Sequence, residues 1–366
     1  MSNGIFAMPE PTRRTVVAGA GLAAFGGLGL AACSTTRPLA VNGEEPRLNL
    51  YTWDTYTPPE TLAAFERATG IAVKVSLYGN NDELFAKLRS GNPGFDVIVP
   101  SNEFVTRMRV SHMLEPLDHA RIPNIANLLP AFRDAPFDPG RRFSLPYTWL
   151  VLGIGYRRSA VDGVPDSWRW LFDSDRYAGR IGLFAEADDL IRLGAKYLGH
   201  SINHVTPAVT EAVEAMLIRQ KPFVKVFHHD EGQDLLVSRE IDLVLEYNGD
   251  IAQVMAEDPD LDFVVPREGT LINSDCFCIP VGAPRRDNAH KFINFMLDAR
   301  VGANVAAAIR YPTPNAAALA LMPADYRDNH AIFPPADRMA RSEYGDYEGM
   351  AHAQMIDEAV TRIFVA

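Results

Sequence analysis

Cysteine is scarce in this chain of 366 residues, and signatures of enzymes are missing from it. Only Cys276 and Cys278 lie beyond the N-terminal 33 residues, two positions apart in a predicted strand. A disulfide over so short a span would be strained, and two cysteines without histidine partners are too few for a zinc site. We therefore expect two buried thiols and neither a metal nor a cofactor. The nucleophile-elbow, zinc-protease, P-loop and dinucleotide-binding motifs are also absent, which argues against an enzyme.

Runs of basic residues and internal repeats are likewise missing. The formal net charge is −11, and phosphate binding needs a basic patch, so a partner made of nucleic acid is disfavoured. Hydrophobic residues make up 47% of the chain and charged residues 22%, which is enough apolar material to bury a core. The acidity is compatible with a cationic ligand.

The first 33 residues have the pattern of an export signal. The pair Arg13-Arg14, which resembles a twin-arginine signal, precedes an apolar stretch at 16–32 that lies near the minimum length of a membrane span. Leu30-Ala31-Ala32-Cys33 resembles a bacterial lipobox, in which the cysteine is acylated. We predict a cleaved signal peptide at 1–32, a lipid on Cys33 and a flexible tether at 33–46. The alternative is an uncleaved anchor helix.

Strands and helices alternate along the rest of the chain, which predicts an α/β fold. Pro59 opens a predicted helix, and Gly70 closes it. The apolar run at 95–99 is typical of a buried parallel strand, and a short strand is predicted at 276–279. No polar linker divides the chain near its middle, so we expect two lobes joined by several crossings, of which the strand at 150–156 is one.

Aromatic residues accompany carboxylates in segments that we expect to be loops after strands, where open α/β sheets bind ligands. These segments are Trp53-Asp54-Thr55-Tyr56, Glu186 with Asp188 and Asp189, Tyr247-Asn248-Gly249-Asp250, Asn273-Ser274-Asp275, and the Pro-rich loop at Tyr311. Carboxylates offset the desolvation of an ammonium ion, and aromatic faces attract it. The five segments therefore predict a site for a small cation.

His228-His229-Asp230 is the one cluster that suggests a metal site. Side chains of neighbouring residues in a strand point to opposite faces, so two adjacent histidines rarely share a metal ion. We interpret both histidines as surface residues.

Several segments resemble the bacterial spermidine/putrescine-binding proteins, which are the solute-binding components of ABC importers. They are the segments at 51–59, 96–101, 136–139, 145–147, 269–280 and 311–315, and the resemblance covers residues 47–366 in order. It implies a two-lobed periplasmic-binding-protein fold of the type II-like kind, with the ligand cleft between the lobes. Lobe 1 would comprise 47–150 plus 275–319, and lobe 2 would comprise 151–274 plus 320–366.

The same resemblance implies a function without catalysis. An exported receptor, in the periplasm or on the outer face of the cytoplasmic membrane, would capture a polyamine and deliver it to an ABC permease with its ATPase. The ligand-binding residues assigned in this way are Trp53, Asp54, Tyr56, Ser101, Glu103, Glu186, Asp189, Tyr247, Asp250, Asp275 and Tyr311.

Three positions depart from the family pattern. Asn273 stands where members usually carry a stacking tryptophan, Glu103 where they carry an aromatic or small residue, and Gly345 where spermidine binders carry a glutamine. The site therefore gains negative charge and loses aromatic stacking. These changes remain compatible with a polyamine ligand, but they leave open which polyamine it is.

Other interpretations also remain open from the sequence. The same fold could bind another cationic solute or a metal ion, and a secreted enzyme is the alternative from a different class. Asp188 and Asp189 could serve only to complement a helix N-terminus, and Asp250 could cap a helix at 251–256. Asp275 is the hardest to interpret as a structural residue, because it interrupts an apolar strand.

The lipobox generates a first prediction. Replacing Cys33 by alanine removes the thiol that would carry the lipid, so Cys33→Ala should leave the membrane fraction while the folded domain stays intact. Fractionation of cells that express either form, followed by immunoblotting, measures the effect. Equal partitioning of the variant and the wild type would show that Cys33 is not the anchor.

Overall fold

The structure is a computed structural model that describes residues 43–54, 56–229 and 231–366. The predicted signal peptide, Cys33 and most of the predicted tether lie outside the described residues. Within the described part, no single helix is long and apolar enough to cross a membrane. Two consecutive helices, Arg286–Met296 and Ala299–Ile309, reach the required length and composition together, but the chain bends by 73° between them.

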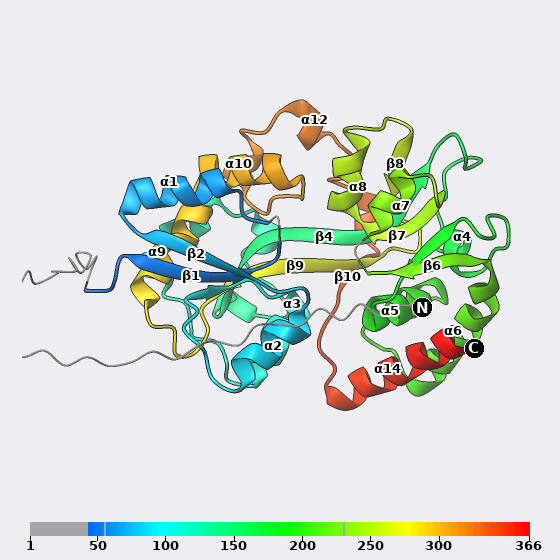
Figure 1. Cartoon of the computed structure of the whole chain (residues 1–366), viewed down its shortest axis with the longest axis horizontal. Helices are drawn as coiled ribbons and strands as arrows, with labels where there is room; N and C mark the ends of the chain where they lie inside the picture. Colours follow the sequence, from blue (N-terminus) through cyan, green and yellow to red (C-terminus); the bar gives the residue numbers. More distant parts are fainter. Residues whose placement is uncertain (1–42, 55, 230) are drawn as a thin grey trace, which may run out of the picture. The chain divides into compact units, whose positions relative to one another are not determined.

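The strands of the described chain form one mixed sheet (Figure 1). They are β1 (Arg47–Thr52), β2 (Ala72–Leu77), β3 (Val97–Ile98), β4 (Ser144–Arg157), β5 (Ile181–Phe184), β6 (Val224–His228), β7 (Leu243–Tyr247), β8 (Leu261–Val264), β9 (Leu271–Cys278) and β10 (Glu343–Tyr344). Their order is β2-β1-β3-β9-β4-β7-β5-β6, with β10 beside β9 and β8 beside β4.

Helices connect most of these strands. The α-helices are α1 (Pro59–Thr69), α2 (Asn81–Arg89), α3 (Asn102–Val110), α4 (Arg169–Phe172), α5 (Ala187–Tyr197), α6 (Pro207–Gln220), α7 (Gly232–Val237), α8 (Asn248–Met255), α9 (Arg286–Met296), α10 (Ala299–Ile309), α11 (Ala316–Leu319), α12 (Ala324–Arg327), α13 (Ala336–Met339) and α14 (Met350–Val365). Single 3-10 turns lie at His119–Arg121, Pro123–Asn127, Pro130–Phe132, Pro139–Arg141 and Lys221–Phe223.

Strand β4 joins the two parts of the sheet. Its first half pairs antiparallel with β9, from Ser144 opposite Cys278 to Val151 opposite Ile272. Its second half pairs antiparallel with β7 and β8. All of its 14 residues are buried, as expected for a strand with packed layers on both faces. The predicted strand at 150–156 is thus confirmed as the end of a longer strand.

Parallel strands flank this antiparallel centre on both sides. Strand β1 runs parallel to β2 and β3, and β5 runs parallel to β6 and β7. Helices α5, α6 and α14 pack together around a core that includes Trp168 and Phe184, while α1 and α9 contribute Phe65 and Phe292 to another core near β1. The predicted alternation of strands and helices is confirmed, as is the helix that Pro59 opens and Gly70 closes in a left-handed conformation, with φ of 72°.

Two strand predictions were wrong in length. The run at 95–99 forms only the two-residue strand β3, because the Val99 carbonyl accepts side-chain hydrogen bonds from Trp53 and Tyr78. Strand β9 begins at Leu271 rather than 276, since the polar residues 273–275 pair with β4. Asn273, Ser274 and Asp275 therefore lie inside a strand and not in a loop after one.

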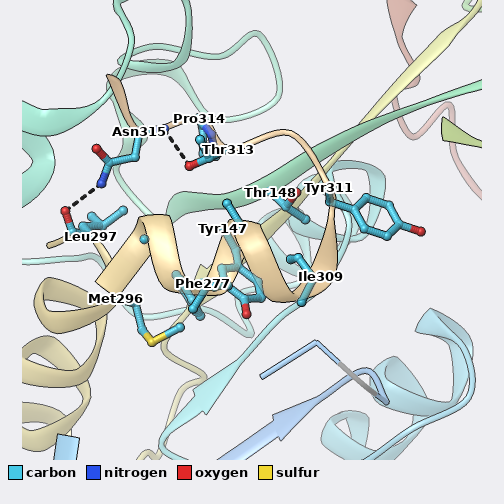
Figure 2. Close-up of a pocket in the computed structure, with 13 residues that line it drawn as sticks. Tyr147, Thr148, Phe277, Met296, Leu297, Ile309, Tyr311, Thr313, Pro314 and Asn315 are labelled. Carbon is cyan, nitrogen blue, oxygen red and sulfur yellow. Dashed lines mark hydrogen bonds between the residues drawn. The ribbon is translucent and has the colours of Figure 1, made fainter. Parts of the chain in front are cut away.

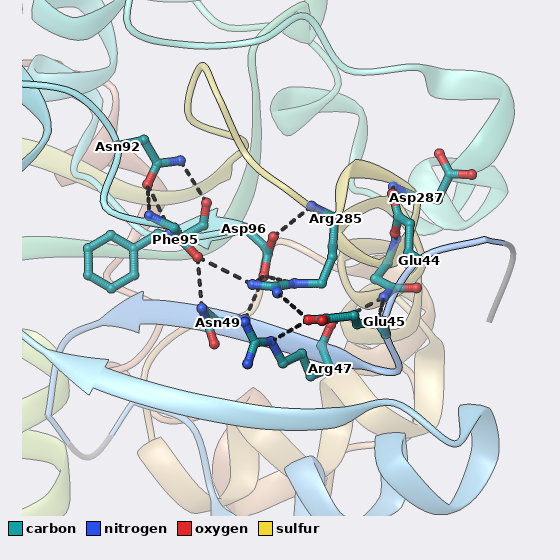
Figure 3. A network of polar contacts seen from close by, with 11 residues as sticks. Glu44, Glu45, Arg47, Asn49, Asn92, Phe95, Asp96, Arg285 and Asp287 are labelled. Atoms are coloured by element: carbon teal, nitrogen blue, oxygen red, sulfur yellow. Dashed lines mark hydrogen bonds and ion pairs between the residues drawn. The ribbon is translucent and has the colours of Figure 1, made fainter. Parts of the chain in front are cut away.

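A buried ion pair ties β3 to the start of α9 (Figure 3). The Asp96 carboxylate is completely buried and accepts hydrogen bonds from the Arg285 backbone and guanidinium, each at 2.9 Å, and from the Asn49 backbone at 2.7 Å. Nearby, the Glu44 carboxylate accepts from the backbone N–H groups of Asp287 and Asn288, the first turn of α9. Burial still raises the pKa of Asp96, although Arg285 lowers it.

This ion pair generates a prediction about stability. Arg285→Met keeps much of the side-chain volume but leaves the Asp96 carboxylate buried without its cation, so the free energy of unfolding should fall by about 3–5 kcal/mol. Chemical denaturation at neutral pH measures the change. The control is Arg47→Met, which removes a half-exposed partner of Glu45 and should cost less than about 1 kcal/mol. Similar losses in the two variants would contradict this account.

Candidate ligand-binding site

Asp275 is the most deeply buried carboxylate of the predicted site, with 3% of the residue exposed. It projects from the middle of β9, where its Oδ1 accepts a hydrogen bond from the Ser101 hydroxyl at 2.6 Å and its Oδ2 accepts one from the Tyr56 hydroxyl at 2.7 Å. Asn81 holds Ser101 in turn, by donating to its hydroxyl oxygen at 3.0 Å. Burial raises the pKa of Asp275 to about 6, although both hydroxyl donors lower it.

Aromatic rings surround Tyr56. Its ring centroid lies 5.8 Å from that of Tyr147, 5.8 Å from that of Tyr311 and 6.4 Å from that of Trp53. The Trp53 indole is fixed from the other side by its hydrogen bond to the Val99 carbonyl and by an edge contact with Tyr78 at 4.6 Å. Trp53 and Tyr56, predicted as an aromatic pair of the site, thus belong to one aromatic wall beside Asp275.

A second phenol and carboxylate meet at the start of α8. The Tyr311 hydroxyl donates to Asp250 Oδ2 at 2.7 Å. The ring lies so close to Gly249 that a Cβ atom there would come within 2.4 Å of it, which only glycine allows. The interpretation of Asp250 as a helix cap was wrong, because Tyr247 occupies the N-cap position and Asp250 lies in the first turn.

A third pair of the same kind joins β7 to α5. The Tyr247 hydroxyl donates to Asp189 Oδ2 at 3.1 Å. Burial, with help from the neighbouring Asp188 and Glu186, raises the pKa of Asp189 to about 7. Asp188 and Asp189 do lie in the first turn of α5, as their structural interpretation requires, but their side chains also bind Arg192 and Tyr247.

The three tyrosine–aspartate pairs lie within electrostatic reach of one another. Asp275 helps to raise the pKa of Tyr247, although Tyr247 binds Asp189. Asp250 likewise helps to raise the pKa of Tyr56, which binds Asp275. Residues from five separate segments of the sequence therefore converge, and each aspartate accepts a hydrogen bond from a neutral phenol.

Glu103 and Asp188 form a further acidic contact beside Asp189. Glu103 lies in the first turn of α3, and a side-chain hydrogen bond to Asp188 joins it to α5. Burial and the charge of Asp188 raise the pKa of Glu103 well above its usual range. Glu103 therefore holds its proton more tightly than an exposed glutamate does.

Other predicted residues lie at the periphery. Glu186 is exposed and pairs with the exposed His229 at 2.8 Å, and Asp54 is also exposed. The interpretation of both histidines as surface residues was wrong for His228, which is 3% exposed. Burial lowers the pKa of His228 to about 4, so the imidazole is neutral. Cys276 and Cys278 are free and buried, as predicted.

A small cavity lies behind the aromatic wall (Figure 2). Its lining is largely apolar and includes Phe277, Met296 and Ile309, together with the rings of Tyr147 and Tyr311. Its volume of about 20 Å³ suffices for a single water molecule and not for a ligand. It therefore adjoins the site without being the site.

Comparisons with known proteins agree with this geometry. Residues 60–334 match the family described as bacterial extracellular solute-binding protein. This chain belongs to that family.

Individual relatives support the same family assignment. The spermidine/putrescine-binding periplasmic protein of Escherichia coli is 33% identical over 306 residues, which cover 83% of this chain and 88% of the relative. A putative spermidine/putrescine ABC transporter structure from Listeria monocytogenes has a TM-score of 0.82 at 32% identity and covers 87% of this chain and 99% of its own. The Tp0655 (TpPotD) lipoprotein of Treponema pallidum has a TM-score of 0.78 at 26% identity, with coverages of 87% and 99%. The fold is that of the two-lobed periplasmic solute-binding proteins.

Several residues that shape the site were not assigned from the sequence. Asn81 orients Ser101, Tyr147 donates to the Tyr56 carbonyl, and Arg192 binds Asp188. Tyr78 and Asn81 follow the end of β2 and carry the aromatic-plus-polar signal that identified the other segments. Nothing in the local sequence of Arg192 indicates its role, because it lies in the middle of an amphipathic helix.

The raised pKa of Asp275 predicts how the stability of the ligand-free protein depends on pH. A carboxyl whose pKa is higher in the folded than in the unfolded state stabilises the fold at low pH, and this contribution is lost as the pH rises through about 6. Between pH 4 and pH 8 the wild type should lose about 2–3 kcal/mol relative to Asp275→Asn, which cannot ionise. Denaturation of both proteins across this range measures the difference. Parallel curves would show that Asp275 titrates normally.

Proposed function

We propose that this solute-binding protein captures a polyamine such as putrescine or spermidine and delivers it to an ABC importer. The observation that carries the proposal is the convergence of Asp189, Asp250 and Asp275, each bonded to a tyrosine hydroxyl. The spermidine/putrescine names of the relatives from Escherichia coli and Listeria monocytogenes support the same ligand class.

The ligand-free site is electrostatically unsatisfied in a way that suits ammonium groups. Phenol hydroxyls donate hydrogen bonds but bring no positive charge, so ionised Asp275 and Asp189 remain costly to bury, as their raised pKa values show. An ammonium group supplies both donors and charge. The rings of Trp53, Tyr56 and Tyr311 suit the methylene segments between the ammonium groups and add cation–π attraction.

Ligand binding would join the two lobes, which we place at 47–150 plus 275–319 and at 151–274 plus 320–366. Asp275 and Ser101 would act from lobe 1, and Asp189, Tyr247 and Asp250 from lobe 2. A ligand that bridges these groups stabilises the closed form, because it contacts both lobes only there. The permease would then recognise the closed form, and the protein itself would perform no catalysis.

We place this receptor in the cell envelope. The sequence at 1–33 supports export through a twin-arginine-like signal and anchoring by a lipid on Cys33. The lipoprotein from Treponema pallidum, with the same fold, is a precedent for such an anchor.

The central experiment compares wild type with Asp275→Asn. The substitution keeps the size and shape of the side chain but removes the counter-charge of a buried ammonium group, a loss of roughly 3–5 kcal/mol. The affinity for putrescine and spermidine should therefore fall by about two to three orders of magnitude. Isothermal titration calorimetry at pH 7.5 measures both affinities.

Asp325→Asn is the matched control. It causes the same change in net charge at an exposed position on α12 and should leave both affinities unchanged. If the wild type binds neither amine at millimolar concentration, the ligand class is wrong. If Asp275→Asn binds as tightly as the wild type, Asp275 is not a ligand contact.

A further inference from the structure

Arg192 is a charged side chain without any exposed surface, and it lies directly behind the acidic end of the site. Its Nε donates to Asp188 Oδ2 one turn earlier in α5. The remaining nitrogens donate to the carbonyls of Ile202 and Asp346, at 2.9 and 2.7 Å, and to Asn203 Oδ1 at 2.9 Å. A fully buried guanidinium with this set of partners is fixed in position and permanently charged.

The contacts of Arg192 hold one segment that also binds α3. The segment at 343–349 passes from β10 to α14, and Arg192 binds it at the Asp346 carbonyl. From the other side, Asn102 of α3 donates to the Gly345 carbonyl at 2.5 Å and Thr106 donates to Asp346 Oδ1 at 2.9 Å. Arg192 therefore cannot swing toward a ligand, and its charge acts from a constant place.

The charge of Arg192 acts on the site through the acidic residues around it. Burial lowers the pKa of Arg192, but Asp188, Glu103 and Glu348 raise it, the last of these from 3.8 Å. Arg192 in turn lowers the pKa of both Glu103 and Asp189, while Asp188 raises both. The bond from the buried guanidinium to Asp188 therefore balances the charge of that carboxylate from within the protein.

We propose that Arg192 is a built-in counter-cation that neutralises the Asp188 carboxylate and so limits the number of ammonium groups that the site accepts. The inference rests on the proposed polyamine binding and assigns Arg192 as a positioning residue for ligand charge. Asp189, Asp250 and Asp275 bind the ammonium groups of the ligand. The negative charge of Asp188, beside Asp189, is already balanced by Arg192.

The test is the ratio of the affinities for spermidine and putrescine, which carry three and two ammonium groups. Arg192→Gln leaves one uncompensated negative charge near Asp189, so the ratio should shift toward spermidine by about tenfold. Asp188→Asn removes the carboxylate that is hydrogen-bonded to the guanidinium and leaves one more positive charge beside the site, so the ratio should shift toward putrescine by a similar factor. The double variant Asp188→Asn/Arg192→Gln restores the balance and should return the ratio to the wild-type value.

This design separates charge from structure. A purely structural role of Arg192 would weaken both amines alike and leave the ratio unchanged, which would overturn the proposal. A shift that persists in the double variant would overturn it as well. If Arg192→Gln does not fold, the direction in which Asp188→Asn shifts the affinity ratio tests the proposal by itself.

Arg300→Gln provides the control for net charge, because Arg300 is exposed on α10 and its loss should not move the ratio. A wild type that binds neither amine would refute the proposed function. A wild type that binds both, with ratios unchanged in the two single variants, would refute only the role of Arg192.

Discussion

The pairing of β9 with strands on both sides is the constraint on which the site depends. Cys278 of β9 pairs with Ile98 of β3, and Asp275 pairs with Thr148 of β4. A strand held on both edges cannot rotate its side chains toward solvent, so the Asp275 carboxylate stays buried whatever its charge. Ser101 follows the end of β3 and Tyr56 follows β1, so the same sheet brings both hydroxyl donors to the carboxylate. The sheet itself therefore fixes the position of the Asp275 carboxylate.

The site balances buried negative charge in two different ways. At Asp275, Asp250 and Asp189 the donors described above are hydroxyl groups, which satisfy lone pairs but leave the charge in place. At Asp188 the donor is a guanidinium, which satisfies both. The negative charge at the Asp188 end of the site is thus balanced within the protein, whereas the charge at the other end is best balanced by a cation that binds from solution. This asymmetry gives the site a direction along which a linear cation can be oriented.

Helices and strands with strong local signals could be predicted from the sequence, but structure that depends on contacts between distant residues could not. The helix between Pro59 and Gly70 was predicted closely, and the strand at 150–156 was recognised as part of β4, because proline, glycine and continuous apolar runs act locally. Strand β9 was predicted too short, because polar residues 273–275 conceal a strand that only its neighbours stabilise. The aromatic and acidic residues of the site could be predicted as groups. Their partners could not: the contact between Glu103 and Asp188 joins residues 85 positions apart, through helices that follow different strands.

The first described residues join the start of β1 to the first turn of α9, and this connection has a mechanical consequence. Glu44 binds the first turn of α9 at Asp287 (Figure 3). The Asn288 amide donates to the carbonyls of Glu45 and Arg47. A pull on the chain from its N-terminal side is therefore shared by several bonds at the start of α9 before any load reaches β1. Trp53 and Tyr56 follow β1, so the aromatic wall is separated by these bonds from a force applied at the N-terminal side of the chain.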